Sequence, residues 1–157
     1  MTDQLSNQIL RKTEEVKELY YHLILLVNDL ADKQAEFKQL AEEASIGSLN
    51  VNLELGRAML PLTTRQRALK TTSLLNKMIS NVSEETILMY HINILFDPAL
   101  KQDPLRLLQN LSRRKTIIAV WDGKIQGKYL IYAEPDHPEY RRYPINDLVL
   151  ISPQNIS

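Results

Sequence analysis

The sequence contains no cysteine, only four glycines and no excess of either charge. Without cysteine, disulfides, thiolate nucleophiles and sulfur-ligated zinc or iron–sulfur centres are all excluded. Nineteen Lys and Arg balance nineteen Asp and Glu, so the formal net charge is zero and bulk electrostatics favours neither nucleic acid nor a membrane surface. The longest early apolar run, 23–27, is far shorter than the roughly 20 residues of a membrane-spanning helix.

The remaining composition is typical of a globular domain. A chain of 157 residues with 44% hydrophobic and 24% charged residues is large enough for one domain with a single core. We divide this domain into an N-terminal helix in 1–20, an α/β core in 21–151 and a tail in 152–157. The amino terminus reads Met-Thr-Asp-Gln, which is unlike a signal peptide, so we expect a cytoplasmic protein with no membrane partner.

The spacing of apolar residues predicts alternating strands and helices. Segment 129–132 is ambiguous, and 133–144, with three prolines, predicts an ordered loop or a short helical turn. The strand at 23–27 has no polar alternation, which indicates that both of its faces are covered. The pattern therefore predicts an α/β fold with a mostly parallel sheet flanked by helices, and ligand sites at the carboxyl ends of the strands. We expect helices at 3–20, 34–44, 64–80 and 104–112, and strands at 23–27, 49–55, 86–96 (with a helical turn near its end), 116–121 and 147–151.

The loop after the first strand lacks the glycine-rich sequence that nucleotide-binding α/β proteins carry at this position. In such proteins a glycine-rich loop ending in Gly-Lys-Ser/Thr surrounds the phosphates with backbone N–H groups. Here 28–33 reads Asn-Asp-Leu-Ala-Asp-Lys, and the glycines lie at 47, 56, 123 and 127. Lys33 is either a vestigial phosphate ligand or an exposed residue of the first helical turn. For Asp29 and Asp32 we favour capping of the next helix over metal binding.

No other pattern predicts a catalytic or metal site. The three histidines show no metal-binding spacing, and there is no Gly-x-Ser-x-Gly nucleophile turn. Asp97 and Asp103 stand beside prolines, where turn formation explains them. Three basic clusters, the last of them close to several tyrosines, are compatible with phosphate contact and base stacking, with protein–protein contacts, or with a solvated surface. These clusters are Arg65, Arg67 and Lys70; Arg113, Arg114 and Lys115; and Arg141 and Arg142.

Several separated segments are distinctive: 52–57 (NLELGR), 62–67 (LTTRQR), 95–98 (LFDP), 102–109 (QDPLRLLQ), 112–113 (SR) and 137–144 (HPEYRRYP). Together they resemble the BrxF family of small P-loop proteins, which belong to type-3 bacteriophage-exclusion (BREX) defence systems. The resemblance extends over about residues 15–151. It implies a three-layer P-loop NTPase-like core of the AAA/ASCE type without a separate lid domain.

The chain departs from this family at the nucleotide site. Lys33 matches the phosphate lysine in position, but Gln34 stands where the family carries the Ser/Thr hydroxyl that binds magnesium. Tyr90 and Asn93 stand where the family pattern has an aspartate and, three residues later, a glutamate. Because magnesium is held through such oxygens together with the phosphates, these losses imply a degenerate site, and we expect no cofactor and no bound metal.

Some family features remain. Asp122, after the strand at 116–121, is in the position of a polar sensor residue. Arg141 and Arg142 precede the final strand, where AAA-type ATPases supply an arginine finger to a neighbouring subunit. Arg113 and Arg114 end a helix that can face a neighbour.

The resemblance and its departures predict a non-catalytic accessory or scaffold protein of a phage-exclusion system. Its partners are then other proteins of the defence complex or further copies of itself. Two alternatives stay open. The first is a working ATPase that binds ATP and magnesium through Lys33, Asp122 and arginines of a neighbour. The second is a DNA-binding subunit that uses the three basic clusters.

Overall fold

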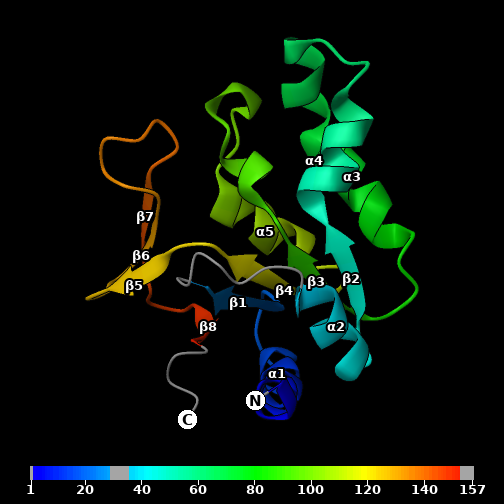
Figure 1. The fold of residues 1–157 in the computed structure, drawn as a ribbon, viewed down its shortest axis with the longest axis vertical. Helices are drawn as coiled ribbons and strands as arrows, with labels where there is room; N and C mark the ends of the chain where they lie inside the picture. The colour runs from blue at the N-terminus through cyan, green and yellow to red at the C-terminus, as the bar shows by residue number, and fades with distance from the viewer. Residues whose placement is uncertain (1, 29–35, 153–157) are drawn as a thin grey trace.

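The computed structural model describes residues 2–28 and 36–152. Its centre is a five-stranded sheet with the order β2-β3-β4-β1-β8, in which every pairing is parallel. A three-stranded antiparallel sheet, with the order β5-β6-β7, stands beside it (Figure 1). The strands are β1 (Leu23–Val27), β2 (Gly47–Asn50), β3 (Thr86–Tyr90), β4 (Thr116–Trp121), β5 (Lys124–Gln126), β6 (Tyr129–Tyr132), β7 (Arg141–Pro144) and β8 (Val149–Ile151).

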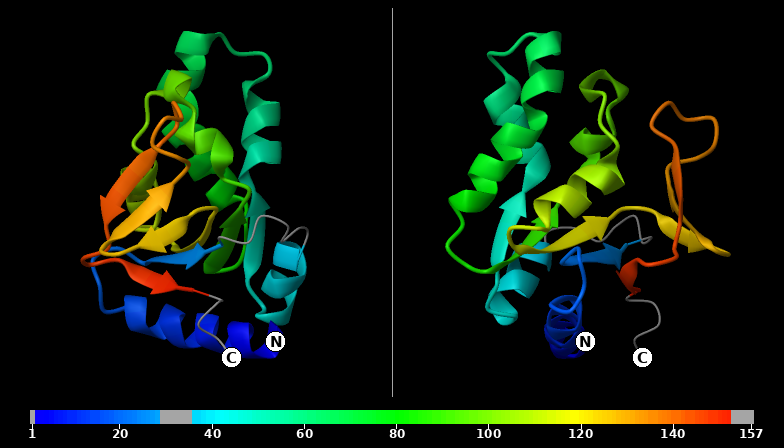
Figure 2. Two further views of the ribbon diagram at one scale, coloured as in Figure 1. Left: turned by 60° about the vertical axis from the view of Figure 1, so that its left-hand side comes forward. Right: turned by 180° about the vertical axis from the view of Figure 1, so that it is seen from behind.

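Helices cover both faces of the five-stranded sheet, as the two further views in Figure 2 show. One face packs against α1 and α2, and the other against α3, α4 and α5. The predicted α/β class, with a mostly parallel sheet flanked by helices, is confirmed. The helices are α1 (Thr2–Val16), α2 (Glu36–Glu43), α3 (Val51–Met59), α4 (Thr64–Ser80) and α5 (Pro104–Leu111), with short 3-10 turns η1 (Asn93–Phe96) and η2 (Pro98–Leu100).

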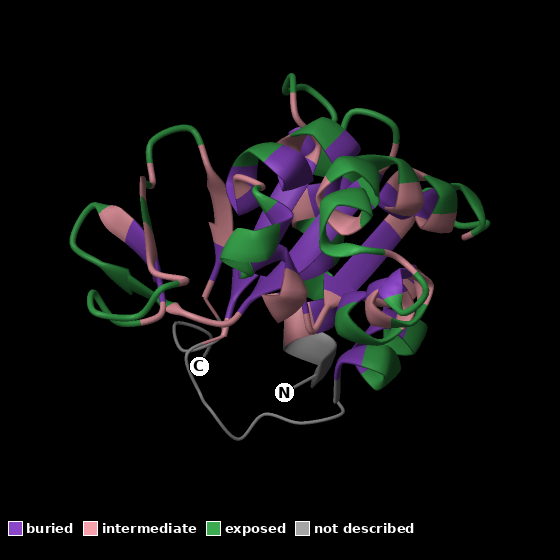
Figure 3. Cartoon of the chain, turned by 90° about the horizontal axis from the view of Figure 1, so that it is seen from above, coloured by how far each residue is buried: buried purple, intermediate pink, exposed green. Residues whose placement is uncertain are grey.

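The core lies on both sides of the central strands (Figure 3). All five residues of β1 are buried. Ile24 and Leu26 pack with α1 and α2, whereas Leu25 and Val27 pack toward α3 and α5. The strand is therefore covered on both faces, as its uninterrupted apolar run predicts. Among the residues that the structure describes, no helix combines the length and apolar character needed to cross a membrane.

Most predicted elements are confirmed. The strands at 23–27 and 116–121 and the helix at 64–80 have the predicted bounds, and the helix at 104–112 ends one residue early. Segment 86–96 contains the strand β3, which ends at Tyr90, six residues before the predicted end, and the expected helical turn, η1. The helix predicted at 34–44 is α2, although residues 34 and 35 lie outside the described part of the chain.

The strand predicted over 49–55 is wrong beyond Asn50. Strand β2 ends there, and α3 begins at the next residue. The Asn50 side chain accepts a hydrogen bond from the Leu53 amide (3.1 Å), which caps the new helix. The apolar residues also fit a helical stripe, because Val51, Leu55 and Met59 are spaced four apart and all three are buried.

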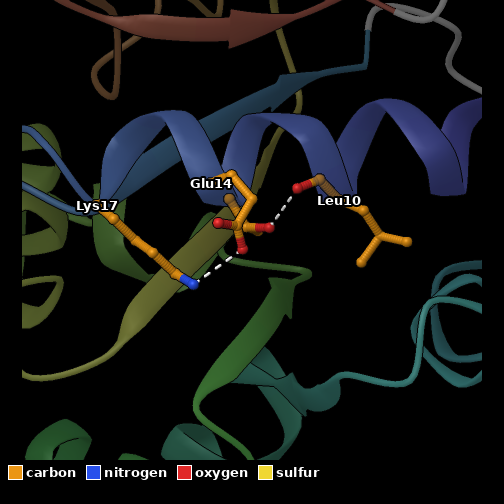
Figure 4. Close-up of polar contacts among 4 residues, drawn as sticks. Leu10, Glu14 and Lys17 are labelled. Carbon is orange, nitrogen blue, oxygen red and sulfur yellow. Dashed lines mark hydrogen bonds and ion pairs between the residues drawn. The ribbon is translucent and has the colours of Figure 1, made fainter.

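Three smaller expectations also differ from the structure. The N-terminal helix ends at Val16 instead of 20, so Tyr20 is 67% exposed. Figure 4 shows its end, where Lys17 donates to Glu14 at 2.8 Å. The apolar spacing within 64–80 also predicts that Leu69 faces inward, but Leu69 is 72% exposed on α4. Segment 133–144 is not only loop, since it contains β7.

The small sheet is joined to the core through aromatic side chains. Segment 129–132, ambiguous in the sequence, is the strand β6. The ring of Tyr132 stacks on Phe96 with centroids 3.6 Å apart, and the indole N–H of Trp121 donates to the Ile131 carbonyl (3.1 Å). Gly123 permits this approach, because a Cβ there would lie 2.0 Å from that same carbonyl oxygen.

Candidate functional site

The strand order directs attention to the carboxyl ends of β1 and β4. These strands are neighbours, but the connections that follow them run in opposite directions across the sheet. After β1 the chain continues to β2, at one edge of the sheet, whereas after β4 it leads to β8, at the other edge. In open α/β sheets, ligands bind where neighbouring connections diverge in this way. The residues that directly follow β1, β3 and β4 therefore form the candidate site.

A hydrogen bond joins the residues that follow β1 and β4. The Asn28 side-chain amide donates to Oδ1 of Asp122 at 3.0 Å, and the Asn28 backbone N–H donates to the Trp121 carbonyl at 2.7 Å. Both Asn28 and Asp122 are half-buried. The predicted sensor position, Asp122, thus lies at the switch point of the sheet and is bound to Asn28.

The environment of Asp122 favours the protonated carboxyl group. Burial raises the pKa of Asp122 above its ordinary value of 3.8, because the charged form loses hydration. The hydrogen bond from Asn28, the charge of His91 and a hydrogen bond from Asn93 each lower the pKa and offset part of that effect. At this site burial therefore disfavours the charged carboxyl group of Asp122, and the amides and the imidazole only partly offset that effect.

A network of amides continues from Asp122 along the ends of the strands. The Asn93 side chain donates to the Tyr132 hydroxyl at 2.7 Å. Asn52, in the first turn of α3, accepts from the Ile94 N–H at 2.9 Å, and its own backbone N–H donates to the His91 carbonyl at 2.8 Å. This network holds η1 against α3 and fixes the position of Asn93.

An aromatic cluster lies between the end of β3 and α2. The Tyr90 ring is 5.9 Å from that of Phe37 and 4.9 Å from that of His91, centroid to centroid, and Phe37 meets His91 edge-on at 6.3 Å. Phe37 itself is 8% exposed. His91 has φ +51°, a left-handed conformation that costs energy for any residue with a Cβ. Apolar packing and one strained residue therefore occupy this end of β3.

The chemistry available here is that of hydrogen bonding and packing. Amides, a phenol, an imidazole and one carboxyl group meet at the ends of β1, β3 and β4. Within residues 2–28 and 36–152, no three His, Asp or Glu side chains gather as metal ligands would. Four residues proposed for the nucleotide site or its cap, Asp29, Asp32, Lys33 and Gln34, lie outside the described residues.

Arg113 and Arg114 lie at the opposite edge of the sheet. They belong to the turn between α5 and β4, and so to the amino end of that strand. The Arg113 guanidinium lies 4.8 Å from the centroid of the Tyr20 ring, just before β1. The adjacent Lys115 ammonium donates to the carbonyl of Glu84 at 3.0 Å. This basic cluster is not brought to the candidate site.

Arg141 and Arg142 contact groups of their own chain. A guanidinium N–H of Arg141 donates to the carbonyl of Gln102 at 2.9 Å, which ties β7 to the loop before α5. The Arg142 guanidinium lies 4.2 Å from the centroid of the Tyr129 ring, which is a cation–π contact. Arg141 is half-buried, whereas Arg142 is exposed.

Arg65 and Arg67 lie at the start of α4 but have different surroundings. The Nε–H of Arg67 donates to the carbonyls of Met59 at 2.9 Å and Leu62 at 3.1 Å, which closes the turn between α3 and α4. Arg65 is exposed. Of the predicted residues that the structure describes, only Asp122 thus lies at the switch point.

Sequence reasoning did not identify Asn28, Asn52 and Tyr132 as part of this site. Asn28 does carry a usable signal, since it is the first polar residue after a fully apolar strand. Its partner is 94 residues away, so the pairing depends on β1 and β4 being neighbours. The chain matches no protein-family model, no curated protein and no solved structure.

Proposed function

We propose that this chain is a degenerate P-loop NTPase-like domain of AAA/ASCE type that serves as a non-catalytic accessory or scaffold protein in a bacteriophage-exclusion defence system of the BREX type. It contributes binding surfaces to a complex with other proteins of that system, or with further copies of itself. It performs no nucleotide hydrolysis. The proposal rests on the motif resemblance together with the geometry at the ends of the strands.

The contact between Tyr90 and Phe37 carries the non-catalytic part of the proposal. In a P-loop protein, magnesium is held between carboxylate oxygen near the end of a strand and a hydroxyl at the start of the helix after the phosphate loop. Here the end of β3 presents the Tyr90 ring, which packs 5.9 Å from the ring of Phe37 on α2. An aromatic pair supplies no oxygen ligand pair for a hydrated cation.

The bond between Asn28 and Asp122 supports the same conclusion. A sensor residue acts by contacting the attacking water or the outermost phosphate, which requires a free polar group. Oδ1 of Asp122 accepts from Asn28 at 3.0 Å, and burial raises the pKa of this carboxyl. Asp122 thus joins the ends of β1 and β4, and its charged form would be repelled by a nearby polyphosphate.

A plating assay tests this proposal in cells that carry the whole defence system. Deleting the gene is expected to abolish phage exclusion, and the wild-type gene restores it. Lys33→Ala and Asp122→Asn, the latter keeping an oxygen that accepts from Asn28, are expected to restore exclusion as well as wild type does. A tenfold or greater loss with either variant at equal protein level would support the ATPase alternative. Restoration by an empty vector would refute the accessory role.

A further inference from the structure

The outer face of α4 carries positive charges and no negative charge. The helix has 17 residues, of which four are Lys or Arg and none is Asp or Glu. Arg65, Lys70 and Lys77 are exposed, and Thr72 and Ser73 are exposed between them. At 1.5 Å per residue, the three charges extend over about 18 Å of helix axis. The outer face of α4 is therefore locally positive, although the net charge of the chain is zero.

The position of Arg65 opposes the stability of the helix. It lies in the first turn of α4, where Asp or Glu interacts favourably with the helix dipole and a cation does not. The N-terminus of α4 is otherwise stabilised, because Thr63 and Gln66 form a reciprocal capping box. A cation retained at this end costs folding energy and strengthens the positive potential of the exposed face.

Neighbouring elements extend this positive surface. The side chain of Gln102 donates to the Ala68 carbonyl at 3.2 Å, which places the exposed Lys101 beside the first half of α4. On α3, the exposed Arg57 lies 3.8 Å from Glu54, so these two charges offset each other. The α3–α4 pair extends away from the sheet, where a large partner can reach it (Figures 1 and 2).

We propose that the outer face of α4 binds the phosphate backbone of duplex nucleic acid without sequence preference. Arg and Lys, together with Ser, Thr and Asn, are the side chains that contact phosphates. By the helical period, Arg65 lies about 120–140° around the axis of α4 from Lys70 and Lys77, so these cations flank the exposed face and can reach phosphates on both sides of a major groove about 12 Å wide. The inference goes beyond the accessory role proposed above and does not depend on it.

Two other polyanionic partners fit this face less well. A single strand binds by stacking its bases on aromatic rings, and α4 contains no aromatic residue. An acidic protein surface needs a cluster of aromatic or apolar anchors at the centre of the interface. On the exposed face of α4 only Leu69 is a large apolar side chain, and the exposed residues one turn away from it, Arg65, Thr72 and Ser73, are polar.

Fluorescence anisotropy with a labelled duplex of about 20 bp and arbitrary sequence tests the proposal. Each phosphate contact contributes a slope of about −0.9 to log K against log salt, so three contacts predict about −2.7. The affinity is then expected to fall about 40-fold between 50 and 200 mM salt. Lys77→Gln is expected to reduce the slope by about one third, and the triple variant R65Q/K70Q/K77Q to remove most of the binding.

The matched control is the triple variant R11Q/K17Q/K38Q, which removes three exposed cations from the opposite side of the sheet. It changes the net charge equally and is expected to keep wild-type affinity within about twofold. The proposal is overturned by any of four results. The first is that wild type fails to bind the duplex at low salt, and the second is that both triple variants reduce the affinity equally. The third is that a single strand of equal length binds more tightly than the duplex, and the fourth is that polyglutamate binds while the duplex does not.

Discussion

Replacing Tyr143 by phenylalanine removes the hydroxyl that joins the small sheet to the loop before α5. That hydroxyl donates to Oδ1 of Asp103 at 2.7 Å. Burial raises the pKa of Tyr143, and the hydrogen bond to Asp103 raises it further, so the phenol stays a donor at all ordinary pH values. Asp103 also caps α5 by accepting from the Arg106 N–H at 3.3 Å. One carboxylate therefore serves both the helix and the sheet.

The expected cost of Tyr143→Phe is about 1 kcal/mol of unfolding free energy. A hydrogen bond to a charged acceptor contributes about 1.5–3 kcal/mol. Both side chains are only half-buried, so water replaces part of the lost bond and the expected cost falls below this range. The remaining bond to Arg106 keeps Asp103 satisfied in the variant. For a chain of this length, such a loss lowers the melting temperature by about 2–4 °C.

A double-mutant cycle measured by urea unfolding isolates this interaction. Tyr143→Phe is combined with Asp103→Ala, which also removes the cap and so costs more on its own. In the Asp103→Ala background, Tyr143→Phe is expected to have little further effect, which gives a coupling energy of about 1 kcal/mol. Tyr20→Phe, at a residue that is 67% exposed, serves as a control with no expected change. A coupling energy below about 0.3 kcal/mol would refute the reasoning.

Two further predictions concern backbone strain and pH. Ser45, two residues after the end of α2, has φ +58°, so Ser45→Gly is expected to raise the unfolding free energy by about 0.5–1 kcal/mol in urea denaturation; a decrease would contradict this. For Asp122, the raised pKa means that the folded state holds its proton to higher pH than the unfolded state, so wild type loses stability as pH rises above about 4. Asp122→Asn does not titrate there, and its stability relative to wild type is expected to increase from pH 4 to 7; thermal melts that show a constant or decreasing difference would contradict the assigned cause.

The elements that the sequence predicts best are those whose signal is local. The apolar runs at 23–27 and 116–121 and the stripes of α4 and α5 are complete within one segment, and the structure agrees with them. Segment 49–55 was misleading because its apolar residues satisfy both a two-residue and a four-residue period over so short a length. The capping bond from Asn50 is compatible only with the helix.

The small sheet depends on contacts that no single segment reveals. Strands β5, β6 and β7 are three or four residues long, and each is stabilised by its partners and by the aromatic contacts of Trp121 and Phe96. The positions of the arginines depend on the same contacts. Arg141 is held by Gln102, 39 residues away, while Arg113 is carried to the amino end of the sheet by the turn between α5 and β4.

Composition and periodicity by themselves determined the α/β class, the covered central strands and the lack of thiol chemistry, since each follows from residue types within a short window. Only the tertiary structure decided which polar residues meet. Asn28 contacts Asp122 because β1 and β4 are neighbours, and Tyr90 contacts Phe37 because α2 crosses the sheet beside β3. Such pairings arise from strand order and from packing between residues far apart in the sequence, so local propensity does not predict them.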